Sequence, residues 1–184
     1  MAKVIAGMTI SLDGFVADSK GSVSDLYPDL ISLRDTDYMR AAIDETGAVL
    51  MGRNTFDMAG DPDSYVGNYE FQVPIFVVTH NPPESPPKQD ERLTFTFVTN
   101  GSEAAAQQAK TAAKGKAVTV VGGPGLIQQL LQGGLVDELR IDVMPVILGA
   151  GLALFGREGL DRIPMRKISV EEIGPRTSLR FERA

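Results

Sequence analysis

The sequence contains no cysteine and only one histidine, His80. The absence of cysteine excludes disulfide bonds, iron–sulfur clusters and a cysteine nucleophile, and one imidazole cannot supply the ligand set of a zinc enzyme. We therefore predict no metal site. Long apolar runs are also missing, because no stretch approaches the roughly 18 apolar residues of a membrane span. The apolar segment after Met1 is too short for a signal peptide, so we expect a cytoplasmic protein without a membrane partner.

A surplus of basic charge is lacking as well. Lysine and arginine number 18 against 24 aspartate and glutamate residues, which leaves a net charge of -6. Such a surface repels a phosphate backbone, so we expect no nucleic-acid partner. Hydrophobic residues make up 43% of the chain, enough for a packed core. The length of 184 residues favours a single domain over residues 1–184.

Apolar periodicity predicts alternating strands and helices. Strands are expected at residues 4–10, 48–51, 74–79, 95–99, 117–121, 139–144, 166–173 and 178–182. Helices are expected at 35–45, capped by Asp35, at 102–114, capped by Ser102, and at 126–132. Residues 18–29, 61–68 and 80–89 are expected to be loops. This order is typical of an α/β fold, with a mostly parallel mixed sheet between helices and an antiparallel C-terminal ribbon.

The strongest local pattern is a strand that runs into Gly122-Gly123-Pro124-Gly125 and then opens a helix at Leu126. Bare glycine backbone and the first N–H groups of a helix are suited to binding a phosphate group. A glycine-rich turn without a ligand explains the pattern equally well. The segment is not the usual dinucleotide fingerprint, because Pro124 and Ile127 occupy two of its glycine positions.

A second strand-to-helix turn has the sequence Gly52-Arg53-Asn54-Thr55. An arginine at a helix start is unfavourable unless an anion compensates its charge, and that anion is either a ligand phosphate or a carboxylate such as Asp57. Thr79 and His80 follow another strand at its carboxyl end, where open sheets bind ligands; a solvated loop is the simpler interpretation of this pair. If the turns at 52–55 and 122–125 converge, they can bind one pyrophosphate from both sides.

Three motifs in order resemble a known family. Residues 5–17, Met51-Gly52-Arg53-Asn54-Thr55-Phe56 and Val120-Val121-Gly122-Gly123 are similar to hallmarks of dihydrofolate reductase-like proteins. The segments 137–140, 144–151 and 154–155 look like the branch formed by the C-terminal reductase domain of the bifunctional deaminase/reductase of riboflavin biosynthesis. The resemblance covers nearly the whole chain. It implies a three-layer fold, a homodimer and an NADPH-dependent reductase.

The resemblance also implies roles for individual residues. The cofactor-binding set comprises Thr9, Val16 and Ala17 at the nicotinamide, Gly52, Arg53, Asn54 and Thr55 at the phosphates, Thr79 and His80 at the adenosine ribose, and Gly122, Gly123, Pro124, Gly125, Leu126 and Ile127 at the pyrophosphate. Arg53 is the candidate partner of the 2′-phosphate. Asp37 is the candidate catalytic carboxylate, with Asp35 equally near its place, and a helix cap is the alternative role for either. Asp142 is a polar residue in an apolar strand, which makes it a candidate substrate ligand unless it lies on an outward face; Asp13 is a second candidate, with a turn as the alternative.

The expected chemistry is hydride transfer from NADPH to a small heterocyclic substrate. A carboxylate or a bound water would deliver the accompanying proton, and residues 18–29 could form a lid. The riboflavin-type substrate, 5-amino-6-(5-phosphoribosylamino)uracil, is the leading candidate. The alternatives are a dihydrofolate reductase, against which the absence of tryptophan argues mildly, a reductase of small carbonyl compounds or xenobiotics, and a non-catalytic NADP-binding dimer.

Overall fold

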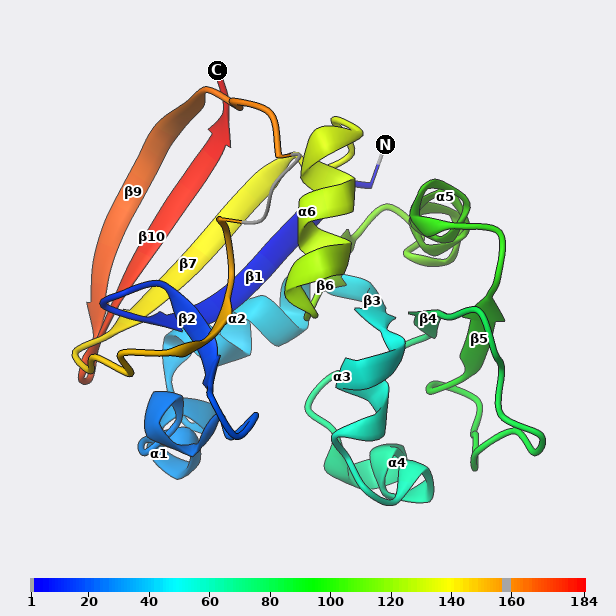
Figure 1. Ribbon diagram of the computed structural model, residues 1–184. Coiled ribbons are helices and arrows are strands. Elements are labelled where there is room, and N and C mark those ends of the chain that lie inside the picture. Colours follow the sequence, from blue (N-terminus) through cyan, green and yellow to red (C-terminus); the bar gives the residue numbers. More distant parts are fainter. Residues whose placement is uncertain (1, 157–159) are drawn as a thin grey trace.

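An eight-stranded sheet forms the centre of the computed structural model, which describes residues 2–156 and 160–184 (Figure 1). The strand order is β5-β4-β3-β6-β1-β7-β10-β9, and β2 and β8 form a separate two-stranded ribbon. Neighbours from β5 to β7 run parallel, whereas β10 is antiparallel to both β7 and β9. The strands are β1 Val4–Ser11, β2 Phe15–Asp18, β3 Thr46–Gly52, β4 Ile75–Val78, β5 Phe95–Val98, β6 Ala117–Val120, β7 Glu138–Met144, β8 Gly151–Ala153, β9 Met165–Ile173 and β10 Arg176–Arg183.

Helices cover both faces of the sheet. They are α1 Leu30–Arg34, α2 Asp37–Glu45, α3 Arg53–Asp57, α4 Tyr65–Asn68, α5 Ser102–Ala112 and α6 Pro124–Gln132, with short 3-10 turns at Ser24–Leu26 and Pro62–Ser64. The alanines of α5 and the leucines of α6 pack on one face of the sheet, in a core that includes Leu50 and Val120. On the other face, Val49 and Met51 pack with aromatic side chains such as Phe56. The expected mixed α/β sheet with an antiparallel C-terminal ribbon is confirmed.

Burial explains why the central strands read as unbroken apolar runs. Residues 48–51 of β3 alternate between the two cores, and each is at most 1% exposed. A strand covered on both faces needs apolar side chains at every position, which is the pattern expected of a parallel sheet between helices. No helix of the described part of the chain is long and apolar enough to cross a membrane.

One half of the sheet has a polar face. Leu139 and Ile141 of β7 enter the apolar core, whereas Glu138, Arg140 and Asp142 lie on the opposite side of the strand. Their partners across the ladder on β10 are Glu182, Arg180 and Ser178. Helix α2 contacts this polar face through Tyr38 and Glu45. Charged side chains are therefore held inside the fold between α2 and two neighbouring strands.

Several helix ends differ from the prediction. Helix α2 begins at Asp37 because the Thr36 side chain, not Asp35, accepts a hydrogen bond from the N–H of Met39 (3.2 Å). Gly101 rather than Ser102 is the N-cap of α5. Helix α6 begins at Pro124, two residues early, because proline at the first helical position loses no hydrogen bond there. Helix α1, helix α4 and strand β8 were not predicted, and residues 61–68 are partly helical.

Candidate functional site

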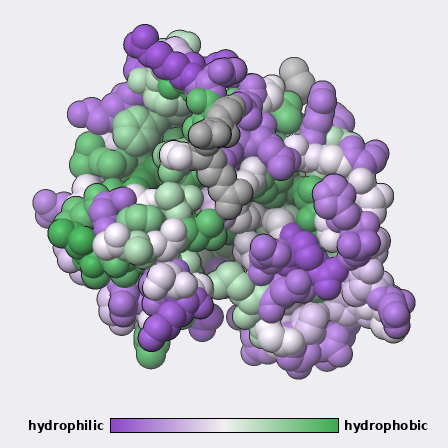
Figure 2. Space-filling model, viewed as in Figure 1, coloured by the Kyte–Doolittle hydropathy of each residue, from purple (hydrophilic) through white to green (hydrophobic). Residues whose placement is uncertain are grey.

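A cleft of about 1290 Å³ opens beside the carboxyl ends of β3 and β6. It is lined by residues of α1 and α2 on one side and of α3 and α4 on the other, with β1 and the start of α6 between them. Figure 2 shows the surface hollowed between the part over α1 and the part over α3 and α4. Enclosed ligand sites for a single drug-sized molecule measure roughly 300–1,000 Å³. The cleft is therefore large enough for a dinucleotide and a second small ligand.

The two glycine turns meet at this cleft. The backbone N–H of Gly52 donates to the carbonyl oxygen of Gly122 (2.9 Å), and the N–H of Val121 donates to the carbonyl of Leu50 (3.1 Å). Gly122 has a φ of +121°, and the peptide bond between Gly122 and Gly123 is cis. A Cβ atom on Gly122 would lie 3.3 Å from Oγ1 of Thr55. The predicted convergence of the turns at 52–55 and 122–125 is confirmed.

The N-terminus of α6 faces the cleft without a side-chain cap. Gly123 is the N-cap residue, and Gly123, Pro124, Gly125 and Leu126 all line the cleft. The N–H groups of Leu126 and Ile127 both donate to the carbonyl of Gly123 (3.1 and 3.2 Å). Ile127 itself is fully buried in the core and does not line the cleft, which corrects its expected contact with a ligand. Its side chain belongs to the apolar face of α6.

Arg53 lines the cleft but already has partners. Its Nε donates to both carboxylate oxygens of Asp57 (2.8 and 2.9 Å), and its Nη1 donates to the carbonyl of Asn81 (2.6 Å). The carboxylate alternative raised by the sequence is thus realised. Thr79 is buried and donates to the same Asn81 carbonyl (3.1 Å), whereas His80 is exposed. Neither Thr79 nor His80 lines the cleft, which corrects their expected contact with a ligand there.

The opposite end of the cleft contains a buried ion cluster. The guanidinium of Arg176 is 1% exposed and donates to Asp29 through Nε (3.0 Å) and Nη2 (2.5 Å). Its Nη1 lies 3.4 Å from Asp142 and 3.3 Å from the hydroxyl of Thr9. Burial lowers the pKa of Arg176, but its hydrogen bonds and ion pairs with the two carboxylates outweigh burial and raise it overall. Arg176 therefore stays charged.

Tyr38 completes this cluster from helix α2. Its hydroxyl donates to Asp142 (3.0 and 3.2 Å to the two oxygens), and the hydroxyl of Ser178 lies 3.4 Å away. Burial, and then the negative charge of Asp142, raise the pKa of Tyr38 to about 12. The phenol is therefore a neutral donor at physiological pH. Because Tyr38 and Arg176 both donate to it, the carboxylate of Asp142 acts as a hydrogen-bond acceptor.

A second ion cluster lies beside the first. Arg140 donates through Nε to Glu138 (2.7 Å) and through both Nη groups to Glu45, at 3.1 Å for Nη2. Arg140 and Glu138 are nearly buried, with side chains 11% and 12% exposed, and Glu45 is 36% exposed. Arg140 and Glu45 line the cleft. Burial lowers the pKa of Arg140, but its hydrogen bonds and ion pairs with Glu45 and Glu138 outweigh burial and raise the pKa overall.

Two sequence predictions for this end are wrong. The side chain of Asp37 is 99% exposed, pairs with Arg40 (2.7 Å) and does not line the cleft. It lies at the first turn of α2, on the solvent side. Asp13 accepts hydrogen bonds from the hydroxyl of Ser11 and the N–H groups of Leu148 and Gly149, so it fixes a turn. The hydrogen bond from Ser11 is the main cause of its lowered pKa.

Most of the remaining predicted residues lie along the cleft. Val16, Ala17, Gly52, Asn54 and Thr55 line it, and Thr9 and Asp142 line the end that holds the ion clusters. Gly122 is buried and does not line the cleft, which corrects its expected contact with the pyrophosphate. Sequence reasoning missed Arg176, Arg140 and Glu45. A signal was present, because charged or polar residues occupy alternate positions of 138–142 and of 176–182. Two neighbouring strands with that pattern place their charges on one face.

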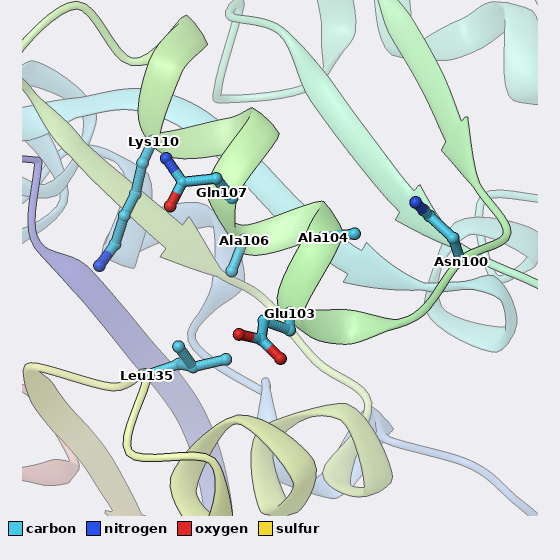
Figure 3. Close-up of a pocket in the computed structure, with 7 residues that line it drawn as sticks. All are labelled: Asn100, Glu103, Ala104, Ala106, Gln107, Lys110 and Leu135. Carbon is cyan, nitrogen blue, oxygen red and sulfur yellow. The ribbon is translucent and has the colours of Figure 1, made fainter.

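A second pocket lies between α5 and the segment that follows α6 (Figure 3). Its volume is about 370 Å³, and it is lined by Asn100, Glu103, Ala104, Ala106, Gln107, Lys110 and Leu135. The charged side chains of Glu103 and Lys110 extend from the surface of the helix in Figure 3. No buried charged group lines this pocket. The large cleft is therefore the candidate site.

The chain is similar to known proteins in sequence and in fold. The model of the family "RibD C-terminal domain" matches residues 2–179. The chain belongs to the RibD C-terminal domain family. YwjB of Bacillus subtilis, a relative, is 27% identical over 99% of this chain and 98% of its own length. The expected family and the resemblance on which it rested are confirmed.

Solved structures of similar fold agree with this family membership. A protein from Shewanella sp. PV-4 that is named for riboflavin biosynthesis is 26% identical, covers 100% of this chain and 99% of its own, and has a TM-score of 0.77. Dihydrofolate reductase from Enterococcus faecalis, solved with NADP(H), is 14% identical over 98% of this chain and 96% of its own, with a TM-score of 0.59. The latter likeness shows a dihydrofolate reductase-like fold.

Proposed function

We propose that this RibD C-terminal domain protein is an NADPH-dependent oxidoreductase that reduces a small heterocyclic substrate. One observation carries the proposal: the turns at 52–55 and 122–125 join at one end of a cleft whose other end holds buried, hydrogen-bonded charges. A single cleft with an anion-binding end and a polar, water-poor end suits a dinucleotide placed beside a second reactant. Membership of the family and the fold of an NADP(H)-binding reductase support the same assignment.

The residues at the glycine end fit the cofactor. Nothing lies within 4 Å of the position that a Cβ of Gly125 would take, so the backbone of α6 is bare where it meets the cleft. The helix end has no side-chain cap and carries a partial positive charge. In the proposal, residues 123–126 hold the pyrophosphate, Asn54 and Thr55 hold it from the other turn, and Arg53 binds the 2′-phosphate.

The first strand and ribbon would hold the nicotinamide. Val16 and Ala17 are each 6% exposed and line the cleft beside Thr9, which gives an apolar wall with one hydroxyl. NADPH, when bound, supplies the hydride. The protein excludes water with Val16 and Ala17 and holds the substrate against Thr9 and Asp142. Such positioning converts a bimolecular reaction into an effectively unimolecular one.

In the proposal, the substrate end orients its ligand through a hydrogen-bond acceptor, and no side chain there donates the proton. Asp142 accepts from Tyr38 and Arg176, so it is placed to accept a further N–H group from a heterocycle. Tyr38, with its pKa near 12, remains protonated and keeps Asp142 in place. Since Asp37 lies outside the cleft, a water molecule at the open side of the cleft is the proposed source of the proton.

The proposal is tested by following NADPH oxidation by the purified chain. A panel contains 5-amino-6-(5-phosphoribosylamino)uracil, its unphosphorylated riboside, dihydrofolate and small carbonyl compounds. We expect NADPH to bind and at least one heterocycle to be reduced. Binding without turnover of any compound would favour a non-catalytic nucleotide-binding protein, and the absence of NADPH binding would reject the proposal.

Arg53 provides a second test of the cofactor. We expect Arg53→Gln to weaken NADPH binding by about tenfold while leaving NADH binding nearly unchanged, because only NADPH carries the 2′-phosphate. Arg40→Gln removes a charge that is exposed and outside the cleft, so it serves as the matched control. Equal losses of affinity for NADPH and NADH would show that Arg53 does not bind the 2′-phosphate.

A further inference from the structure

Every tyrosine of the chain lines the cleft. The sequence contains four: Tyr27, just before α1, and Tyr38 in α2 lie on one side, and Tyr65 in α4 and Tyr69 directly after it lie on the other. Tyr38 belongs to the ion cluster with Asp142, whereas the proposed function assigns no role to the other three. Apolar side chains line the cleft beside these three. Together they form what we call the apolar slot, which consists of Tyr27, Leu30, Leu33, Met39, Met51, Met58, Tyr65, Tyr69 and Phe71.

The wall of the slot at α4 is a row of packed rings. The rings of Tyr65 and Tyr69 meet edge to face with their centroids 4.9 Å apart, and those of Tyr69 and Phe71 do so at 5.7 Å. Burial raises the pKa of Tyr65 to about 12. Burial also holds the pKa of Tyr69 well above its ordinary value, with smaller contributions from charges that include Tyr27 on the other side of the cleft. This wall is therefore neutral and aromatic, and Tyr27 is close enough to Tyr69 to interact with it across the slot.

Tyr27 connects the slot to the position proposed for the reacting ring. The guanidinium carbon of Arg176 lies 5.7 Å from the centre of the Tyr27 ring, a cation–π contact that holds this ring in place. Burial raises the pKa of Tyr27, and a hydrogen bond with Thr9 opposes the rise. Thr9 is where the substrate is proposed to meet the nicotinamide. The slot therefore begins beside the reacting ring and continues between α1 and α4 (Figure 1).

Methionine side chains supply much of the remaining lining. Met39 comes from α2, Met51 from the end of β3, and Met58 follows the last residue of α3. A thioether makes favourable contacts with an aromatic ring and adapts to its shape. It has no donor for a phosphate group and is only a weak acceptor for a sugar hydroxyl. The composition of the slot thus favours an aromatic group over a sugar phosphate.

Two apolar side chains of the slot are open to water. Leu30 of α1 is 48% exposed, and Met58, on the other side of the cleft, is 61% exposed. A ligand group that covers them gains free energy in proportion to the apolar area removed from water. Within the segments 27–34 and 58–71, the charged residues that line the cleft are Arg34 and Glu70, which have opposite signs. Apolar contact rather than net charge is therefore what these two segments offer a ligand.

We propose that the apolar slot binds an aromatic substituent carried by the heterocycle that is reduced. The inference rests on the proposed function and narrows its substrate class to heterocycles with an aryl group. The heterocycle lies beside Thr9, and its substituent lies between Tyr27 and the ring of Tyr69, where edge-to-face contacts are available. A ribosyl group in the same place would exchange the hydration of its hydroxyl groups for contacts with thioethers and ring carbon atoms, which is unfavourable.

The experiment compares uracils that differ in one substituent. Binding of 6-aminouracil, 6-anilinouracil and 6-(ribosylamino)uracil to the NADPH-loaded protein is measured by calorimetry. We expect the anilino compound to bind at least about tenfold more tightly than 6-aminouracil, because burial of an apolar ring is worth that factor or more, and the ribosyl compound to show no such gain. No gain from the phenyl ring, or an equal or larger gain from the ribosyl group, overturns the inference. Failure of NADPH itself to bind instead rejects the proposed function.

Neighbouring residues of α1 provide a matched pair of variants. Leu30→Asn places an amide in the slot, whereas Ile31→Asn makes a comparable change at a side chain that is 86% exposed and does not line the cleft. Both side chains are exposed, so we expect both variants to fold. Leu30→Asn should reduce the advantage of 6-anilinouracil over 6-aminouracil by several-fold with NADPH affinity unchanged, and Ile31→Asn should leave that advantage as in the wild type. Equal effects of the two substitutions would contradict the placement of the ring.

A variant on the other side of the cleft tests whether both walls contact the substituent. Met58→Gln keeps the length of the side chain but replaces its thioether by an amide. We expect the same several-fold reduction in the advantage of 6-anilinouracil, because Met58 lines the slot opposite Leu30. An unchanged advantage in Met58→Gln would contradict a slot with two walls.

Discussion

Gly125 offers a test in which stability and cofactor binding should change in opposite directions. It is the second residue of α6, lines the cleft and does not have a positive φ, so its backbone already suits any L-residue. A Cβ added there would meet no atom within 4 Å. The folded protein therefore has room for Gly125→Ala, and the new methyl group points into space that the proposed pyrophosphate occupies.

The size of both effects follows from this geometry. Replacing a helical glycine by alanine stabilises a protein by up to about 0.5–1 kcal/mol, since alanine loses less backbone entropy on folding. For a chain of this length that corresponds to a rise in Tm of roughly 1–4 °C. A methyl group between the helix N–H groups and a phosphate should weaken NADPH binding at least tenfold, or about 1.4 kcal/mol.

The assay combines thermal unfolding without ligand and NADPH titration followed by fluorescence. Gln129→Ala is the matched control, because it lies on the exposed side of the same helix and should leave NADPH affinity unchanged. The reasoning is refuted if Gly125→Ala binds NADPH as tightly as the wild type. A variant that loses stability would also contradict the open geometry at this position.

Three further predictions concern the fold around the site. Arg176→Met leaves two buried carboxylates without their cation, so it should lower the free energy of unfolding by about 3–5 kcal/mol in urea titrations; a loss below 1 kcal/mol would contradict this. The pKa of Tyr38 is about 12 in the folded protein and about 10 in the unfolded chain. The stability that its protonated hydroxyl adds to the folded state is therefore complete below pH 10 and is lost as the pH rises toward 12. We expect Tyr38→Phe to lose less stability than the wild type between pH 9 and 12, by on the order of 2 kcal/mol; parallel pH profiles would argue against it. A Cβ on Gly47 would overlap the carbonyl oxygen of Ala113, so Gly47→Ala should destabilise the protein by about 3 kcal/mol, and an unchanged Tm would count against that packing.

Much of the fold could be predicted because buried strands have a recognisable pattern of apolar residues in the sequence. The central strands are covered on both faces and are apolar at every position, so their runs are recognisable in the sequence. Short helices and strands have no such sequence pattern. Helix α1 has five residues and buries only Leu33, and β8 has three residues that depend on pairing with β2. Their existence is decided by tertiary contacts rather than by the pattern of neighbouring residues.

The two ends of the cleft also differ in how well the sequence predicts them. The glycine end is built from two continuous segments, each of which carries its own strand-to-helix pattern, and their convergence could be inferred from a parallel sheet. The substrate end brings together Asp29, Tyr38, Asp142 and Arg176, which are separated by up to 147 residues in sequence. Arg176 follows a hairpin turn, where an arginine is ordinarily solvated. Only the packing of α2 and β10 shows that it is buried.

The central claim is that both glycine turns hold the same anionic ligand. Backbone amide chemical shifts of residues 52–55 and 123, 125 and 126 can be followed together while NADPH is titrated into the protein. We predict that both segments respond and that their shifts give one common Kd. A response of one segment alone, or two clearly different Kd values, would contradict the shared site.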